Sequence, residues 1–282
     1  MAEELSPRGG SALASHSRMV AMPASPRVRS LVPKEHGAYA QLGLPLLTGL
    51  CMGKPGWFSL LLSVGFLAAL LAHEPLLVAM GRRGPRARRD DGARARFRLM
   101  GLLALGSASL SAVLAFAPHT VRGALVIPAT LGIVTGLVLL ADAERSLLGE
   151  WVAAAALSST IVPLSVAGGR SPAEALQAFV VFVLGFFASV SAVRASIATK
   201  KHGVGIASRL MPVLATGAVG LILAGLRVVP LWVPIAAAPM VAGAVVLAAF
   251  PPPPRALMRV GWMLVATSVA TAALVVIHAR SP

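Results

Sequence analysis

The chain has 282 residues, of which 57% are hydrophobic and only 12% are charged, and its formal net charge at pH 7 is +15. A soluble globular domain is about one-quarter charged and less than half apolar, so this composition excludes that class. The single cysteine excludes a disulfide framework and a cysteine-ligated zinc or iron–sulfur site, and the few aromatic residues argue against a nucleic-acid partner.

The first 32 residues are rich in Ser, Ala, Pro and Arg and contain no apolar core of the kind that a signal peptide needs. We therefore expect residues 1–32 to form a disordered cytoplasmic tail. The remainder, residues 33–282, is expected to form a single transmembrane helical domain.

Apolar runs long enough to cross about 30 Å of hydrocarbon follow one another through the rest of the chain. We expect an all-α, polytopic membrane protein with about nine spans, eight being the alternative count. The first run contains Pro45 and is expected to be tilted, broken or partly interfacial, and residues 227–230 are expected to form a tight turn. The predicted spans are 38–53, 57–80, 99–117, 123–141, 147–167, 175–193, 208–226, 228–250 and 261–278.

Polar residues crowd the entry to the first span. Lys34, Glu35 and His36 are consecutive, Gly37 follows them, and Gln41 lies one turn inside the run. We predict that the four polar side chains contribute to a ligand-binding site at the membrane surface.

The second span contains His73 and Glu74, followed by Pro75. An ionisable side chain inside a span costs about 2.5–3.5 kcal/mol on insertion scales, so each one is a candidate for function. One interpretation is that Glu74 is protonated, or pairs with an arginine from a neighbouring helix, and only locks helix packing. The other is that His73 and Glu74 act as a catalytic acid and base, or that Glu74 is a cation ligand, beside a cytoplasm-facing cavity.

The basic segment 81–98 contains Gly84 and Pro85, which we expect to interrupt any long helix, so it is predicted to be a loop. Its main interpretation is an anchor against anionic headgroups. The alternative is a site for an acidic or phosphorylated ligand.

Arg194 ends the sixth span, and Lys200, Lys201 and His202 follow it. If the helix continues, Arg194 and Lys201 share one face, and two cations on one face suit a diphosphate or carboxylate ligand. The alternative is that Arg194 only extends to the headgroups. The pattern Lys-x-His-Gly at 34–37 recurs at 200–203, and both copies lie on the predicted cytoplasmic side.

The basic residues set the orientation. With strict alternation of nine spans, 20 of the 25 Lys and Arg residues lie on one side. Because cytoplasmic loops carry an excess of Lys and Arg, the N-terminus is expected in the cytoplasm.

Three motifs resemble the YwiC-like family of bacterial membrane proteins. They are 33–40 at the start of the first span, 73–76 late in the second and 193–197 at the end of the sixth. The resemblance spans residues 33–278. It implies an integral protein of the bacterial cytoplasmic (inner) membrane.

A more distant resemblance is to UbiA-type intramembrane prenyltransferases, which have nine helices and a cytoplasmic active site after the second and sixth. It implies a UbiA-like bundle. Those enzymes hold magnesium on a diphosphate with two Asp-rich motifs, whereas Leu77 and Gly81 stand here where further acids would be expected. We therefore predict no metal and no cofactor, and prenyltransferase-like chemistry that is lost or altered.

The leading hypothesis is a membrane protein that binds an anionic isoprenoid or lipid in a cytoplasm-facing cavity, with Arg194, Lys200 and Lys201 as the anion clamp. The alternatives are a small-solute transporter or permease, favoured by proline-interrupted spans, and a non-catalytic membrane scaffold. The sequence does not decide whether the protein is an enzyme, nor its oligomeric state.

Overall fold

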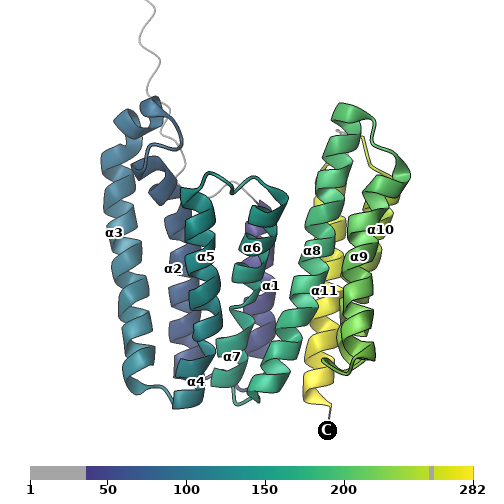
Figure 1. The fold of residues 1–282 in the computed structure, drawn as a ribbon. Coiled ribbons are helices and arrows are strands. Elements are labelled where there is room, and N and C mark those ends of the chain that lie inside the picture. The colour runs from purple at the N-terminus through teal and green to yellow at the C-terminus, as the bar shows by residue number, and fades with distance from the viewer. Residues whose placement is uncertain (1–35, 254–256, 282) are drawn as a thin grey trace, which may run out of the picture. The chain divides into compact units, whose positions relative to one another are not determined.

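The computed structural model describes residues 36–253 and 257–281, and these fall within one compact unit, Leu31–Pro282. Every regular element among the described residues is a helix (Figure 1). The predicted tail, Lys34 and Glu35 lie outside the described residues. In chain order the helices are α1 (His36–Met52), α2 (Trp57–Ala79), α3 (Pro85–Phe116), α4 (His119–Ala124), α5 (Val126–Leu140), α6 (Leu147–Ser158), α7 (Ile161–Ala167), α8 (Pro172–His202), α9 (Ile206–Gly225), α10 (Trp232–Ala249) and α11 (Leu257–Arg280).

The predicted all-α, polytopic architecture is confirmed. Among the described residues, eight helices, counting α4–α5 and α6–α7 as one each, are long and apolar enough to cross a membrane. The helix α1 coincides with the first predicted run but has only 17 residues, fewer than the roughly 20 that a perpendicular span needs. The predicted turn at 227–230 lies between α9 and α10.

Helix breaks occur at places other than the one expected. The helix α1 is continuous through Pro45, whereas the fifth run divides into α6 and α7 at Ser159 and Thr160. Both hydroxyls donate to carbonyls three residues earlier, a local bonding that competes with the α-helical pattern. Pro163 has no N–H for the Ser159 carbonyl, which accepts from Val162 instead. The break therefore follows from Pro163 and its hydroxyl neighbours.

The predicted loop 81–98 is wrong, because α3 begins at Pro85 and runs for 32 residues. Proline is well accommodated in the first turn of a helix, and Gly84 precedes it with a φ of +96°. Arginine and alanine, which dominate the segment, are good helix formers. At about 1.5 Å per residue α3 is about 48 Å long, so it extends beyond the hydrocarbon layer at one end.

Helix packing divides into neighbouring groups. The helices α2 and α3 pack closely on one another through Gly65, Ala68, Gly106 and Ser109. The helix α8 packs on α6 and α7 on one side and on α9 and α10 on the other, while α1 packs on α6, α7 and α11 (Figure 1). The core contains the fully buried Phe182 of α8. The helix α8 therefore connects α6 and α7 with α9 and α10.

Contacts between distant loops define two ends of the helical domain. At what we call the Arg194 end, Arg82 pairs with Asp142, and Arg194 donates to the carbonyl of Arg145. At the other end, which we call the Arg170 end, three hydrogen bonds join the last residues of α1 and the loop after it to other segments. The alternation of nine spans predicts the same grouping of loops. The bonds at the Arg170 end are Lys54 N–H to Gly168 O at 2.9 Å, Arg170 Nε to Met52 O at 2.6 Å and Arg280 Nε to Cys51 O at 2.9 Å.

Candidate functional site at the Arg194 end

Glu74 lies near the end of α2, and its partner is Arg83 in the turn before α3. Only 5% of Glu74 is exposed, and its carboxylate accepts from Arg83 Nε at 3.1 Å and Nη2 at 2.5 Å. Arg83 can reach back because the turn that follows α2 contains Gly81, whose φ of +79° reverses the chain. Glu74 is therefore paired with an arginine, but this arginine comes from the turn after its own helix and not from a neighbouring helix as the sequence interpretation has it.

His73, the other predicted catalytic residue, is partly buried on α2. It makes no hydrogen bond or ion pair with the other described residues. Consecutive residues of a helix point about 100° apart, so His73 and Glu74 face different directions. The backbone geometry therefore does not present them as one acid–base pair.

Arg194 makes two contacts with the segment that opens α6. Its Nη1 donates to Glu150 Oε1 at 2.8 Å and to the carbonyl of Arg145 at 2.9 Å, and both side chains of the ion pair are 38% exposed. Ser146 caps the N-terminus of α6 and so fixes the turn that carries Glu150. Arg194 therefore sits at the boundary between the helices and solvent, already paired.

The helix α8 continues past Arg194 to His202, as the sequence predicts for a shared face. Lys200, Lys201 and His202 belong to this last turn, but their side chains lie outside what the structure describes. The same holds for the His36 side chain at the start of α1, while Gln41 is partly buried one turn later.

The structure gives Glu74 and Arg194 separate partners on separate helix groups. The helix α2 packs on α3 and α7, whereas α8 packs on α6, α7, α9 and α10. The predicted residues of this site therefore divide into a Glu74–Arg83 pair and an Arg194–Glu150 pair.

A cluster of buried polar atoms lies next to the Arg194–Glu150 pair. Trp151 of α6 stacks on Phe187 of α8 with ring centroids 4.9 Å apart, and its buried Nε1 has no hydrogen-bond partner among the described residues. Ser191, 3% exposed, likewise has an unpartnered hydroxyl. Because Phe187, Ser191 and Arg194 are spaced at four and three residues, they share the face of α8 that meets α6.

Tyr39 of α1 contributes a third unpartnered buried atom, its hydroxyl oxygen. The helix α1 runs parallel to α6–α7, since Gly49 approaches Ile161 and Leu164, and further along both segments Gly53 approaches Gly168. Tyr39 lies ten residues before Gly49, and Trp151 lies ten residues before Ile161, so the two residues are at a similar height along the helix axes. We call Tyr39, Trp151 and Ser191 the polar cluster.

The sequence motifs do not identify the polar cluster or the role of Glu150. Glu150 and Trp151 stand together at the entry of a span, and a tryptophan directly after an acid is a signal that could have identified both. Ser191, three residues before Arg194, could have been found by extending the face of α8 backwards.

The arrangement can recognise a polar headgroup. A guanidinium stands at the solvent boundary, and an indole N–H and two hydroxyls lie behind it among apolar helices. No group of three or more His, Cys, Asp or Glu side chains within the described part of the chain could hold a metal ion. The residues present do not fit the carboxylate-held magnesium of UbiA-type enzymes, because both oxygens of Glu74 accept from Arg83.

Comparison with known proteins bears on the first half of the chain. Residues 32–166 match a family model described as YwiC-like protein. The matched segment contains Tyr39, Glu74 and Trp151 and ends before α8, so Arg194 lies outside it. No curated protein and no solved structure matches the chain.

Proposed function

Because this multi-pass membrane protein is YwiC-like over residues 32–166, we propose that it binds an anionic amphiphile, an acidic lipid or an isoprenoid phosphate, at the Arg194 end. We place this end in the cytoplasm of a bacterium and the protein in the inner membrane, since this end carries most of the basic residues. The proposal is one of binding and includes no catalytic step.

The observation that supports it is the polar cluster. Three buried hydrogen-bonding atoms without a partner among the described residues come from α1, α6 and α8, three helices that pack on one another. Leaving a buried donor or acceptor unsatisfied costs about 1–3 kcal/mol each, and inside a membrane water is scarce. A ligand headgroup with acceptor and donor atoms would remove this penalty.

Arg194 supplies the charge for an anionic headgroup. Arginine binds phosphate and carboxylate through two parallel hydrogen bonds, and it is more weakly hydrated than lysine. In the absence of a ligand, Arg194 forms an ion pair with Glu150. An incoming anion would displace the Glu150 carboxylate, so Arg194 would keep a negatively charged partner. Lys200 and Lys201, later on the same helix, add positive charge to this end.

Retention of lipid by the purified full-length protein tests the proposal. We expect native mass spectrometry in mild detergent to show a bound anionic lipid or isoprenyl phosphate. Arg194→Gln is expected to lower its occupancy about tenfold, and Glu150→Gln to raise it because Arg194 loses its internal partner. Trp151→Phe keeps the stack on Phe187 but removes Nε1, and is also expected to lower occupancy.

Arg122→Gln serves as the matched control, because Arg122 is an exposed arginine on α4, away from the polar cluster. The proposal is wrong if the wild-type protein retains no anionic lipid. It is equally wrong if Arg194→Gln retains as much as Arg122→Gln.

A further inference from the structure

Four helices end in the same way, and this comparison singles out Arg227. The helices α2, α5, α7 and α9 each close with the paired backbone bonds of a Schellman motif, which places one residue in the left-handed region. Glycine is usual at that position because a Cβ is strained there. The four residues are Gly81, Asp142, Gly169 and Arg227.

The two residues that are not glycine carry strain, with φ of +54° at Asp142 and +57° at Arg227. The ion pair with Arg82 accounts for an aspartate at position 142, because it joins the ends of α2 and α5. Arg227 makes no hydrogen bond or ion pair through its side chain with any described residue. A strained residue that persists without an internal partner suggests a partner outside the chain.

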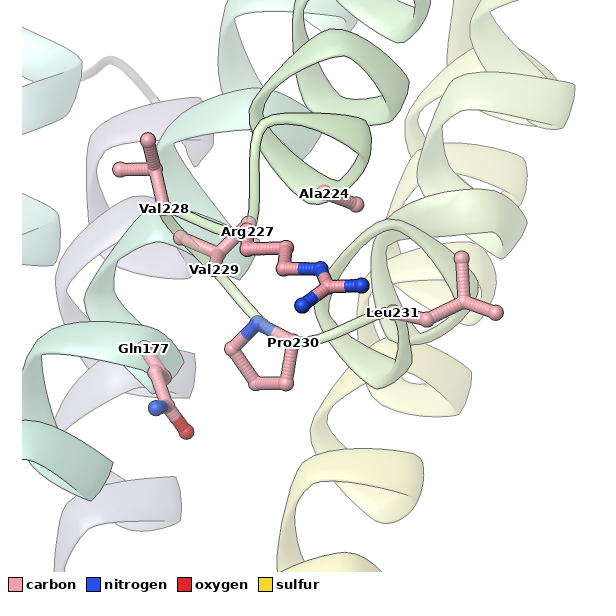
Figure 2. Close-up of a pocket in the computed structure, with 7 residues that line it drawn as sticks. All are labelled: Gln177, Ala224, Arg227, Val228, Val229, Pro230 and Leu231. Carbon is pink, nitrogen blue, oxygen red and sulfur yellow. The ribbon is translucent and has the colours of Figure 1, made fainter.

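The surroundings of Arg227 indicate the chemistry of that partner. Arg227 lines a pocket of about 400 Å³, together with Gln177 of α8, which likewise has no side-chain hydrogen bond to the described residues. Figure 2 shows the extended Arg227 side chain, from the α9–α10 turn, and the Gln177 amide among the residues that line this pocket. A guanidinium and an amide together are suited to phosphate oxygens.

Large apolar side chains flank the same turn and face outward. Leu226 is 69% exposed, Val228 67% and Leu231 63%. A soluble phosphate ion would leave these side chains uncovered, whereas the acyl chains of a lipid would cover them. The apolar rim therefore favours a lipid phosphate over a free one.

This pocket is separate from the polar cluster. Gln177 and Arg194 are 17 residues apart on α8, about 26 Å at 1.5 Å per residue. Trp232, at the start of α10, lines a second pocket with Met52 and Arg170, which places the α9–α10 turn at the Arg170 end.

We propose that Arg227 and Gln177 form a phospholipid-headgroup site in the leaflet at the Arg170 end, with the phosphate on the two side chains and the acyl chains along Leu226, Val228 and Leu231. A bound phosphate would explain why an arginine, and not a glycine, occupies this strained backbone position. The site also differs from general headgroup contact by an exposed arginine, because an arginine and an amide that line one pocket, together with an apolar rim, define it.

Thermal unfolding of the full-length Arg194→Gln protein in detergent, a background that removes the site proposed above, tests this. We expect short-chain phosphatidylglycerol to raise the unfolding midpoint in a saturable way. Diacylglycerol, which lacks the phosphate, and inorganic phosphate, which lacks the chains, are expected to leave the midpoint unchanged.

Arg227→Gly separates a ligand role from a structural one. Glycine relieves the left-handed strain, so the midpoint without lipid should stay the same or rise, while half-saturation by phosphatidylglycerol should need about tenfold more lipid. Arg227→Lys keeps the charge but not the paired donors and should also bind more weakly.

Several results would overturn the proposal. They are no saturable shift in the Arg194→Gln background, an equal shift in Arg227→Gly, a full effect from diacylglycerol or inorganic phosphate, and a lower lipid-free midpoint in Arg227→Gly. The last result would show that Arg227 serves the fold alone.

Discussion

Arg83 Nη2 lies 2.5 Å from Glu74 Oε2, with 24% of the Arg83 side chain and 7% of the Glu74 side chain exposed. The acid that the sequence places inside a span is therefore neutralised by the turn that follows the same helix. The pair lies nine residues apart in the chain, so it closes a local loop and ties the end of α2 to the start of α3.

Glu74→Gln should destabilise the protein, because it removes the buried carboxylate that accepts from the largely buried Arg83 guanidinium. Breaking a buried pair from one side costs about 3 kcal/mol. Chemical denaturation in detergent micelles measures the loss. Asp90→Asn is the matched control, since the Arg86–Asp90 pair at 3.7 Å is exposed and its loss should not be measurable. Equal stability of the two variants would show that the Glu74–Arg83 pair contributes nothing.

Asp142→Gly should be more stable than Asp142→Ala. Both lose the ion pair with Arg82, but only glycine relieves the φ of +54°, and left-handed strain costs about 1–2 kcal/mol in other residues. Thermal unfolding of the two variants side by side measures the difference. If alanine is tolerated as well as glycine, the left-handed conformation at 142 is not strained.

Gly53→Ala should be strongly destabilising, because a Cβ at this position would lie 2.3 Å from the backbone carbonyl of Gly168, to which the Lys54 N–H is bonded. That backbone cannot move without breaking the junction of α1 with the segment after α7. Gly43→Ala on α1 is the control, since nothing lies within 4 Å of its Cβ, and alanine is the better helix former by about 1 kcal/mol. Expression level and unfolding midpoint in the same detergent compare the two, and a Gly53→Ala protein as stable as Gly43→Ala would contradict the close approach.

The two ends should face opposite sides of the membrane, with the Arg194 end in the cytoplasm. In a Cys51→Ser background, a cysteine at the exposed Lys54 should react with a membrane-impermeant maleimide in intact cells. A cysteine at the exposed Arg96 should react only after lysis. The reverse labelling pattern would invert the orientation, and labelling of both would contradict the alternation of spans.

Much of the helical architecture could be predicted from the sequence, since a helix is the regular structure that satisfies every backbone group of an apolar run within a single segment. The positions of the helix breaks could not be predicted, because they depend on side-chain hydroxyls that compete for the backbone hydrogen bonds of the helix. Pro45 is tolerated inside α1, whereas Pro163 combines with Ser159 and Thr160 to end α6. Pro85 was expected to interrupt a helix, and instead it begins one.

The class of protein, the nine apolar runs and the conspicuous polar residues inside them follow from the amino-acid sequence, because hydropathy and charge are local properties of the chain. The partners of those polar residues follow from the packing of the helices. Glu74 pairs with Arg83, and Arg194 pairs with Glu150. The side-chain polar atoms of Tyr39, Trp151 and Ser191 are buried without a partner among the described residues. Arg227 occupies a strained backbone position. Pairing depends on the registers of helices far apart in the chain, and hydrophobic periodicity does not encode those registers.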